Sequence, residues 1–255
     1  MEPEKILQEI ANQVAGCKSC QLNLSRKKAV PGEGPVSAEI MLIGEGPGFY
    51  ENEQGKPFVG AAGKFLDELL EKAGVSRKEV FITNVVKCRP PGNRDPQPEE
   101  LSACGAYLDR QIEAISPLII VTLGRYSMSR FLPNVRISEV HGKPAWVRGR
   151  LIIPMFHPAA ALHQPSLKTS VERDFARLPE WIVEARQNGK NSAGHAIAEP
   201  SGAPQGTPYA QRATPIPQAR QESLLMPETE PAEEPPAVQE PEQVKKDSPT
   251  QLSLF

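Results

Sequence analysis

The sequence lacks any segment that would insert into a membrane or direct export. No apolar run among its 255 residues approaches the length that spans a bilayer. The first five residues are mostly polar or charged, and no apolar stretch of the signal-peptide type follows them. We therefore expect a cytoplasmic protein that does not bind membranes.

Cysteine is also scarce, with four residues in the whole chain. So few cysteines exclude a small secreted domain held together by disulfides, and disulfides are not expected in a cytoplasmic protein. The four cysteines, Cys17, Cys20, Cys88 and Cys104, therefore need another explanation.

An excess of charge of one sign is missing, since the formal net charge is only −2. This balance hides a division, because the segment from Lys190 to the end holds nine acidic and five basic residues. The remainder of the chain is then mildly basic, at about +2. Such an excess permits nucleic-acid binding without requiring it.

Apolar and aromatic residues become rare after about residue 189. This segment contains eleven of the 27 prolines and two aromatic residues, Tyr209 and Phe255. It cannot bury enough apolar surface to offset the entropy lost on ordering. We predict a folded domain over residues 1–188, followed by a disordered Pro/Glu-rich linker over residues 189–250.

Within the folded part, apolar runs alternate with amphipathic stretches. This alternation predicts an α/β fold, a three-layer α/β/α sandwich whose four-stranded, mostly parallel sheet is covered on both faces. The predicted strands are 40–43, 80–86, 118–124 and 151–156, and the main predicted helices are 3–15, 61–73, 98–115 and 169–186.

A glycine-rich loop over residues 44–60 joins the first predicted strand to the next main helix. Ligands of open α/β sheets bind beyond the carboxyl ends of the strands, and glycines let the backbone approach a ligand closely. The glycines alone are equally typical of a simple turn. Phe58 favours a binding site, because an aromatic ring in a polar loop suits stacking on a flat ligand.

The cysteines begin with a C-x-x-C pair, Cys17 and Cys20, followed at long intervals by Cys88 and Cys104. Buried cysteines often act only as small apolar residues, but a C-x-x-C pair beside a basic stretch argues against that interpretation. Four thiolates could hold a tetrahedral zinc ion or an iron–sulfur cluster, and their spacing does not decide between the two.

Four short motifs together resemble the family 4 uracil-DNA glycosylases, the iron–sulfur uracil glycosylases of bacteria and archaea. The resemblance extends over residues 5–186 and implies a four-stranded parallel sheet between helices. It also implies a [4Fe–4S] cluster on the four cysteines, and a nucleoid-associated enzyme that binds uracil-containing DNA. The motifs are Gly44-Glu45-Gly46-Pro47-Gly48, Gly55-Lys56-Pro57-Phe58-Val59-Gly60, Asn84-Val85-Val86-Lys87-Cys88-Arg89-Pro90 and His157-Pro158-Ala159.

The resemblance also implies roles for individual residues in binding a uracil that has been flipped out of the DNA. Phe58 would stack on the base, and Asn84 would bind its O4 and N3 edge. The backbone of Glu45 and Gly46 would meet O2. Glu51 would crowd C5 and so disfavour the methyl group of thymine.

His157 would donate to O2 as negative charge develops on the leaving base, which makes His157 and Asn84 the expected catalytic residues. Related families activate water with an aspartate at the position of Gly46, so no general base is identified. A related group traps DNA covalently through a loop histidine. The matching loop here, residues 89–103, has none, and turnover is expected.

Leu162 follows the His-Pro pair in a segment that resembles the minor-groove loop of the family. It could wedge into the gap left by the flipped base, as apolar side chains do elsewhere. The alternative is an ordinary core leucine at the start of a helix, and the sequence does not separate these two roles.

The last five residues resemble the peptide by which bacterial proteins dock on the replicative sliding clamp; its expected anchors are Gln251, Leu252, Leu254 and Phe255. A chance match in a disordered tail is the alternative.

For the whole chain we expect a monomeric uracil-DNA glycosylase. The competing hypotheses are a non-catalytic uracil or single-stranded DNA binding protein of the same fold and a redox-sensing iron–sulfur protein.

Overall fold

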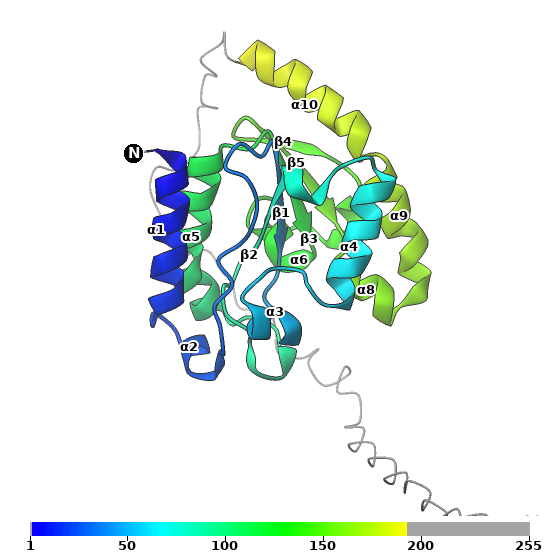
Figure 1. The fold of residues 1–255 in the computed structure, drawn as a ribbon. Helices are drawn as coiled ribbons and strands as arrows, with labels where there is room; N and C mark the ends of the chain where they lie inside the picture. The colour runs from blue at the N-terminus through cyan, green and yellow to red at the C-terminus, as the bar shows by residue number, and fades with distance from the viewer. Residues whose placement is uncertain (1, 193–255) are drawn as a thin grey trace, which may run out of the picture. The chain divides into compact units, whose positions relative to one another are not determined.

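Five strands form one sheet in the computed structural model, which describes residues 2–192 (Figure 1). Their order across the sheet is β2-β1-β3-β5-β4, and the first four are parallel. The four predicted parallel strands are therefore confirmed. The strands are β1 (Ile40–Gly44), β2 (Val80–Asn84), β3 (Ile119–Leu123), β4 (Ala145–Val147) and β5 (Arg150–Met155).

Strand β4 was not predicted. It has three residues and pairs antiparallel with β5 at the edge of the sheet. Arg148 and Gly149 connect the two strands, and both have positive φ, at 50° and 75°. Two such residues form the tight turn whose twist matches a hairpin. A strand of three residues is too short to show the alternation of apolar and polar residues that sequence reasoning depends on.

The helices confirm the predicted ones at 3–15, 61–73 and 98–115. The predicted helix at 169–186 is two helices that meet at Arg177, because Pro179 lies in the first turn of the second and disfavours continuation of the first. The helices are α1 (Pro3–Gly16), α2 (Leu22–Ser25), α3 (Phe49–Gln54), α4 (Ala61–Lys72), α5 (Pro98–Ile115), α6 (Arg125–Ser129), α7 (Ile137–Val140), α8 (Pro158–His163), α9 (Lys168–Ala176) and α10 (Leu178–Ser192). Short 3₁₀ turns occupy Arg77–Glu79, Pro91–Asn93 and Pro165–Leu167.

The side chains of β1 alternate between two cores, one on each face of the sheet. Ile40 and Leu42 belong to the core formed with α4, α9 and α10. Met41 and Ile43 belong to the core formed with α5, against which α1 also packs. Figure 1 shows the resulting layers, with α1 and α5 on one face and α4, α8 and α9 on the other.

Helix α10 continues to Ser192, four residues beyond the predicted domain boundary at residue 188. Most of the predicted linker and the predicted clamp peptide, residues 251–255, lie outside the described residues. Over residues 2–192, no helix is both long and apolar enough to cross a membrane.

Candidate active site

The carboxyl ends of the parallel strands bring the predicted site residues to one edge of the sheet. Gly44 and Asn84 end β1 and β2 and are partners in the strand register. His157 follows β5, and its β-carbon lies 3.3 Å from where a β-carbon on Gly124, just after β3, would stand. Figure 1 shows α3 and α8 at this same edge. Residues more than a hundred positions apart therefore meet at one site.

Asn84 is almost completely buried, with 1% of its surface exposed. Its Oδ1 is one of three buried side-chain polar atoms in the described part of the chain that have no hydrogen-bond partner. A buried acceptor without a partner is costly in a folded protein, and such atoms are often completed by a ligand. Asn84 Oδ1 is thus available to accept a hydrogen bond from a ligand N–H group.

Gly44 makes room for this amide. A β-carbon at Gly44 would lie 2.4 Å from Asn84 Oδ1 and 2.8 Å from the ring of Phe58, both far inside contact distance. The absence of a side chain at the end of β1 therefore allows the amide and the aromatic ring to converge.

His157 is the N-cap of α8, and its Nδ1 accepts a hydrogen bond from the backbone N–H of Ala159 at 3.1 Å. Burial lowers the pKa of His157 to about 4, with Glu51 acting weakly in the opposite direction. The ring is therefore neutral at pH 7. Because Nδ1 is an acceptor, the single ring proton must be on Nε2, and the cap sets His157 up as a donor through that atom.

Phe58 has a positive φ of 52°, which is strained for an aromatic residue, and is 5% exposed. Its ring stacks against that of His157, with centroids 5.5 Å apart and planes 25° from parallel. The two rings form one continuous wall of the site. Such a strained residue persists only where its surroundings hold it in place.

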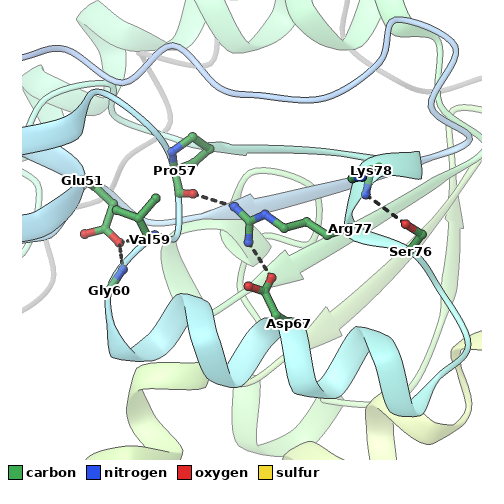
Figure 2. Close-up of polar contacts among 8 residues, drawn as sticks. All are labelled: Glu51, Pro57, Val59, Gly60, Asp67, Ser76, Arg77 and Lys78. Carbon is green, nitrogen blue, oxygen red and sulfur yellow. Dashed lines mark hydrogen bonds and ion pairs between the residues drawn. The ribbon is translucent and has the colours of Figure 1, made fainter.

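Two groups of polar contacts hold the loop that carries Phe58 in place (Figure 2). Glu51 Oε1 accepts hydrogen bonds from the backbone N–H groups of Val59 and Gly60, at 2.8 and 2.9 Å. Arg77 donates to the carbonyl oxygen of Pro57 at 2.7 Å and pairs with Asp67 at 2.7 Å. These contacts connect the loop to α3 on one side and to α4 on the other.

Glu45 directly follows β1 and is half-buried. Burial and the nearby charge of Asp95 raise the pKa of its carboxyl group to about 7, while Arg125 opposes the shift. Arg125 also pairs with Asp95 and is the first residue of α6, two positions after β3 ends. A carboxyl group with this pKa can either hold or accept a proton near neutral pH.

The two remaining predicted site residues, Gly46 and Leu162, differ in their surroundings. Gly46 packs closely, since a β-carbon there would lie 2.8 Å from Val86. Leu162 in α8 is 47% exposed, so the alternative of a core leucine is wrong. Its role as a wedge stays a prediction.

The four cysteines line one small cavity between α1, α2, α5 and the chain after β2. Burial raises the pKa of the Cys104 thiol to about 11 and also raises that of Cys88. Arg26 donates to Cys88 Sγ at 3.1 Å, and the backbone N–H of Lys87 donates to Cys104 Sγ at 3.2 Å. Donors aimed at sulfur suit thiolates, which buried cysteines become when they bind a metal.

The donor set therefore fits a thiolate-bound group in its chemistry, because it combines four sulfurs, apolar neighbours such as Val14 and Leu22, and N–H donors. Over residues 2–192, however, no three cysteine, histidine or acidic side chains are grouped as ligands of a single metal ion.

Sequence reasoning missed Lys87, which is fully buried at 1% exposure. Its ammonium group donates to Thr83 Oγ1 at 2.5 Å, to the Asn84 carbonyl oxygen at 2.8 Å and to Gln111 Oε1 at 2.7 Å. A lysine next to a cysteine carries no sequence signal of burial. Arg125 was also missed, although its position after the third strand could have placed it at the same edge.

Comparison with known proteins points to the same family as the sequence motifs. The model of the family described as the Uracil DNA glycosylase superfamily matches residues 31–178. The chain is 46% identical over 191 residues to a type-4 uracil-DNA glycosylase of Sulfurisphaera tokodaii, an alignment that covers 71% of this chain and 87% of the relative.

Two further relatives bear the same description. The protein of Saccharolobus solfataricus is 50% identical over 186 residues, with 68% of this chain and 85% of the relative covered. The protein of Thermotoga maritima is 44% identical over 184 residues, with 70% of this chain and 96% of the relative covered.

Proposed function

Because this chain belongs to the uracil-DNA glycosylase superfamily, its reaction is the hydrolytic release of uracil from DNA, and we propose how its own residues perform that reaction. The observation that carries the proposal is the buried, unpartnered Oδ1 of Asn84 beside the stacked rings of Phe58 and His157. These groups match a flat base with one donor edge and two carbonyl oxygens.

Asn84 selects uracil over cytosine. Its Oδ1 accepts the uracil N3–H, and its amide nitrogen donates to O4. Cytosine has an acceptor at N3 and a donor at C4, so both contacts would be reversed and a buried acceptor would stay unpaired, which is the strongest form of discrimination. Phe58 stacks on the base, and Glu51, held by two backbone N–H groups, crowds C5 against thymine.

His157 acts on the bond-breaking step. As the N-glycosidic bond breaks, negative charge moves onto uracil O2, and a neutral imidazole that donates from Nε2 stabilises it most in the transition state. The backbone of Glu45 and Gly46 meets O2 from the other side. The fixed Nδ1 acceptor keeps the donating proton on the correct nitrogen.

Glu45 supplies the proton acceptor that the sequence did not identify. With a pKa near 7, its carboxylate can take the proton of the water that attacks the sugar as the base leaves. Burial is the main cause of this raised pKa; Asp95 raises it further and Arg125 lowers it. An aspartate at the position of Gly46, which related families have, is then not needed to accept the proton of the attacking water.

The proposal is tested with Asn84→Ala and His157→Asn in uracil-release assays on a defined oligonucleotide. Each should lower kcat by about a hundredfold or more while changing DNA affinity far less, because their contacts strengthen as charge develops. Trp146→Ala, at the distant β4 edge, is the matched control and should behave as the parent. Parental rates in both site variants would rule out the assignment.

We propose that Cys17, Cys20, Cys88 and Cys104 would together hold a [4Fe–4S] cluster. The cluster would connect the chain near α1 and α2 to the end of β2 and to α5, and the chemistry it supplies is structural cross-linking. The family relationship supports this choice over zinc. Purified protein should be brown, with about four irons per chain. Cys88→Ser should lose the iron and lower the melting temperature, and stoichiometric zinc without iron would contradict the proposal.

We also propose that the Pro/Glu-rich segment after α10, up to residue 250, tethers the catalytic domain to a bacterial sliding clamp through residues 251–255. Tethering would raise the local enzyme concentration on clamp-loaded DNA, at the nucleoid, without altering the active site. The sequence pattern supports it, with apolar anchors isolated in a polar, Pro-rich segment.

Leu254→Ala/Phe255→Ala should abolish binding of the full chain to a bacterial clamp and leave uracil release from a short oligonucleotide at the parental rate. Fluorescence titration of the clamp measures the first, and Ser253→Ala is a matched control within the same peptide. Equal clamp affinity of the parent and the double variant would mark the pentapeptide as a chance match.

A further inference from the structure

Two aromatic side chains lie exposed next to the uracil site. Phe49 and Tyr50, in the first turn of α3, are 53% and 58% exposed. Their rings meet edge to face with centroids 5.4 Å apart. Among the large apolar side chains exposed within residues 2–192, the one other aromatic is Trp146, on the edge strand β4. Exposed aromatics that adjoin each other are typical of interaction surfaces.

The helix that presents these rings is firmly anchored. Asn52, in the same helix, is buried, and its Oδ1 and carbonyl oxygen accept the backbone N–H groups of Lys27 and Lys28 at 2.9 and 3.1 Å. The next residue after the pair, Glu51, holds the loop of Phe58 (Figure 2). The exposure of the rings is therefore a fixed feature of the fold.

The rings are continuous with the pocket. The edge of the Tyr50 ring lies 3.4 Å from where a β-carbon on Gly60 would stand, and Gly60 is bound by Glu51. On the other side, the guanidinium carbon of Arg89 lies 5.3 Å from the centroid of the Phe49 ring. Arg89 belongs to the chain that follows β2 and Asn84, so the rings lie between two pocket-forming segments.

Arg89 adds a charge that suits a phosphate. It donates from Nε to Asn93 Oδ1 at 2.8 Å and lies over the ring of Phe49, and within residues 2–192 its side chain forms no ion pair with a carboxylate. A cation beside aromatic faces is the combination that binds single-stranded nucleic acid, where bases stack on the rings and the phosphate meets the cation.

We propose that Phe49, Tyr50 and Arg89 form a stacking surface for the nucleotide next to the flipped uracil in single-stranded DNA. In a duplex, the neighbours of a flipped nucleotide remain base-paired inside the helix, so they cannot turn outward to stack on these rings. In a single strand those faces are free, and stacking is tolerant of sequence. The inference rests on the proposed function, because the strand is placed by uracil in the pocket.

The test compares KM for uracil release from a single-stranded oligonucleotide and from the same strand in a U·G duplex, with the full chain loaded with its cofactor. Phe49→Ala/Tyr50→Ala should raise the single-strand KM about tenfold more than the duplex KM, as expected for the loss of one base stack. Phe49→Leu, which keeps apolar area but removes a ring, should show a smaller change in the same direction. Trp146→Ala is the control, and melting temperatures show that each variant is folded.

Arg89→Gln should reduce the salt dependence of the single-strand KM by about 0.7 in the slope of log KM against log salt, the value for one phosphate contact. Iron content checks that the adjacent Cys88 site is intact in this variant. An equal rise of both KM values, or no rise in either, would overturn the proposal. Failure of the parent to release uracil from both substrates would instead refute the proposed function.

Discussion

Replacing Gly44 by alanine tests the convergence of Asn84 and Phe58 directly. The new β-carbon would lie 2.4 Å from Asn84 Oδ1 and 2.8 Å from the Phe58 ring, whereas ordinary contacts begin at 3.4 Å. The amide oxygen must therefore retreat by about 1 Å and the ring by about 0.6 Å. A misplacement of about 1 Å in a catalytic site costs on the order of a hundredfold in rate, or about 2.7 kcal/mol of transition-state stabilisation.

The assay is single-turnover uracil release at saturating enzyme, which isolates the chemical step. Gly16→Ala is the matched control: nothing lies within 4 Å of the new β-carbon, and the residue ends α1 away from the site. It should leave the rate unchanged and raise stability slightly, by up to about 1 kcal/mol. A Gly44→Ala enzyme that is folded and within about threefold of the parental rate would refute the reasoning, because the site would then tolerate the displacement.

Three further predictions concern the surroundings of the site. Because the pKa of His157 is about 4 in the folded chain and 6.5 in the unfolded chain, only the unfolded chain takes up a proton between these pH values, so the unfolding free energy should fall by at most about 3 kcal/mol as pH drops from 6.5 to 4. Urea melts at pH 7 and 4.5 should show this loss of stability in the parent and a smaller loss in His157→Asn. Arg77→Ala should lower the unfolding free energy by about 1–2 kcal/mol and raise KM, because the strained loop of Phe58 loses the hydrogen bond to the Pro57 carbonyl oxygen. Arg136→Ala, at an exposed arginine, is the control, and an unchanged KM in Arg77→Ala would show that the site does not need this hydrogen bond. Lys87→Met should lower the unfolding free energy by about 2 kcal/mol and slow uracil release, because the Asn84 carbonyl oxygen and Gln111 lose a buried donor. Urea melts and kcat measure the two effects, and no change in either would show that removing a buried charge offsets the lost hydrogen bonds.

Much of the fold was predictable because its parallel strands are continuous apolar runs and its longer helices are strongly amphipathic. Asn84 and His157, which the resemblance singled out, each stand at or just after the end of a parallel strand, and the structure brings them to the same end of the sheet. The short elements β4 and α3 were missed, because three to six residues give no reliable period.

The parts of the site that could not be predicted depend on burial and on long-range pairs. The charge state of Glu45 depends on its burial and on Asp95 and Arg125, which are 50 and 80 positions away in the sequence. The burial of Lys87 depends on α5 closing over it through Gln111. No local pattern encodes such an environment, so the residue types were visible in the sequence while their chemical state was not.

The position of His157 at the start of α8 affects how any mutagenesis at this residue should be interpreted. The same ring nitrogen that fixes the donor tautomer also holds the first turn of the helix that carries Leu162. An alanine there would remove two things at once, a proton donor and the start of a helix, and its phenotype would mix lost chemistry with a displaced α8. Asparagine, a strong N-cap residue without an imidazole, separates the two effects, and for that reason it is the informative substitution at this position.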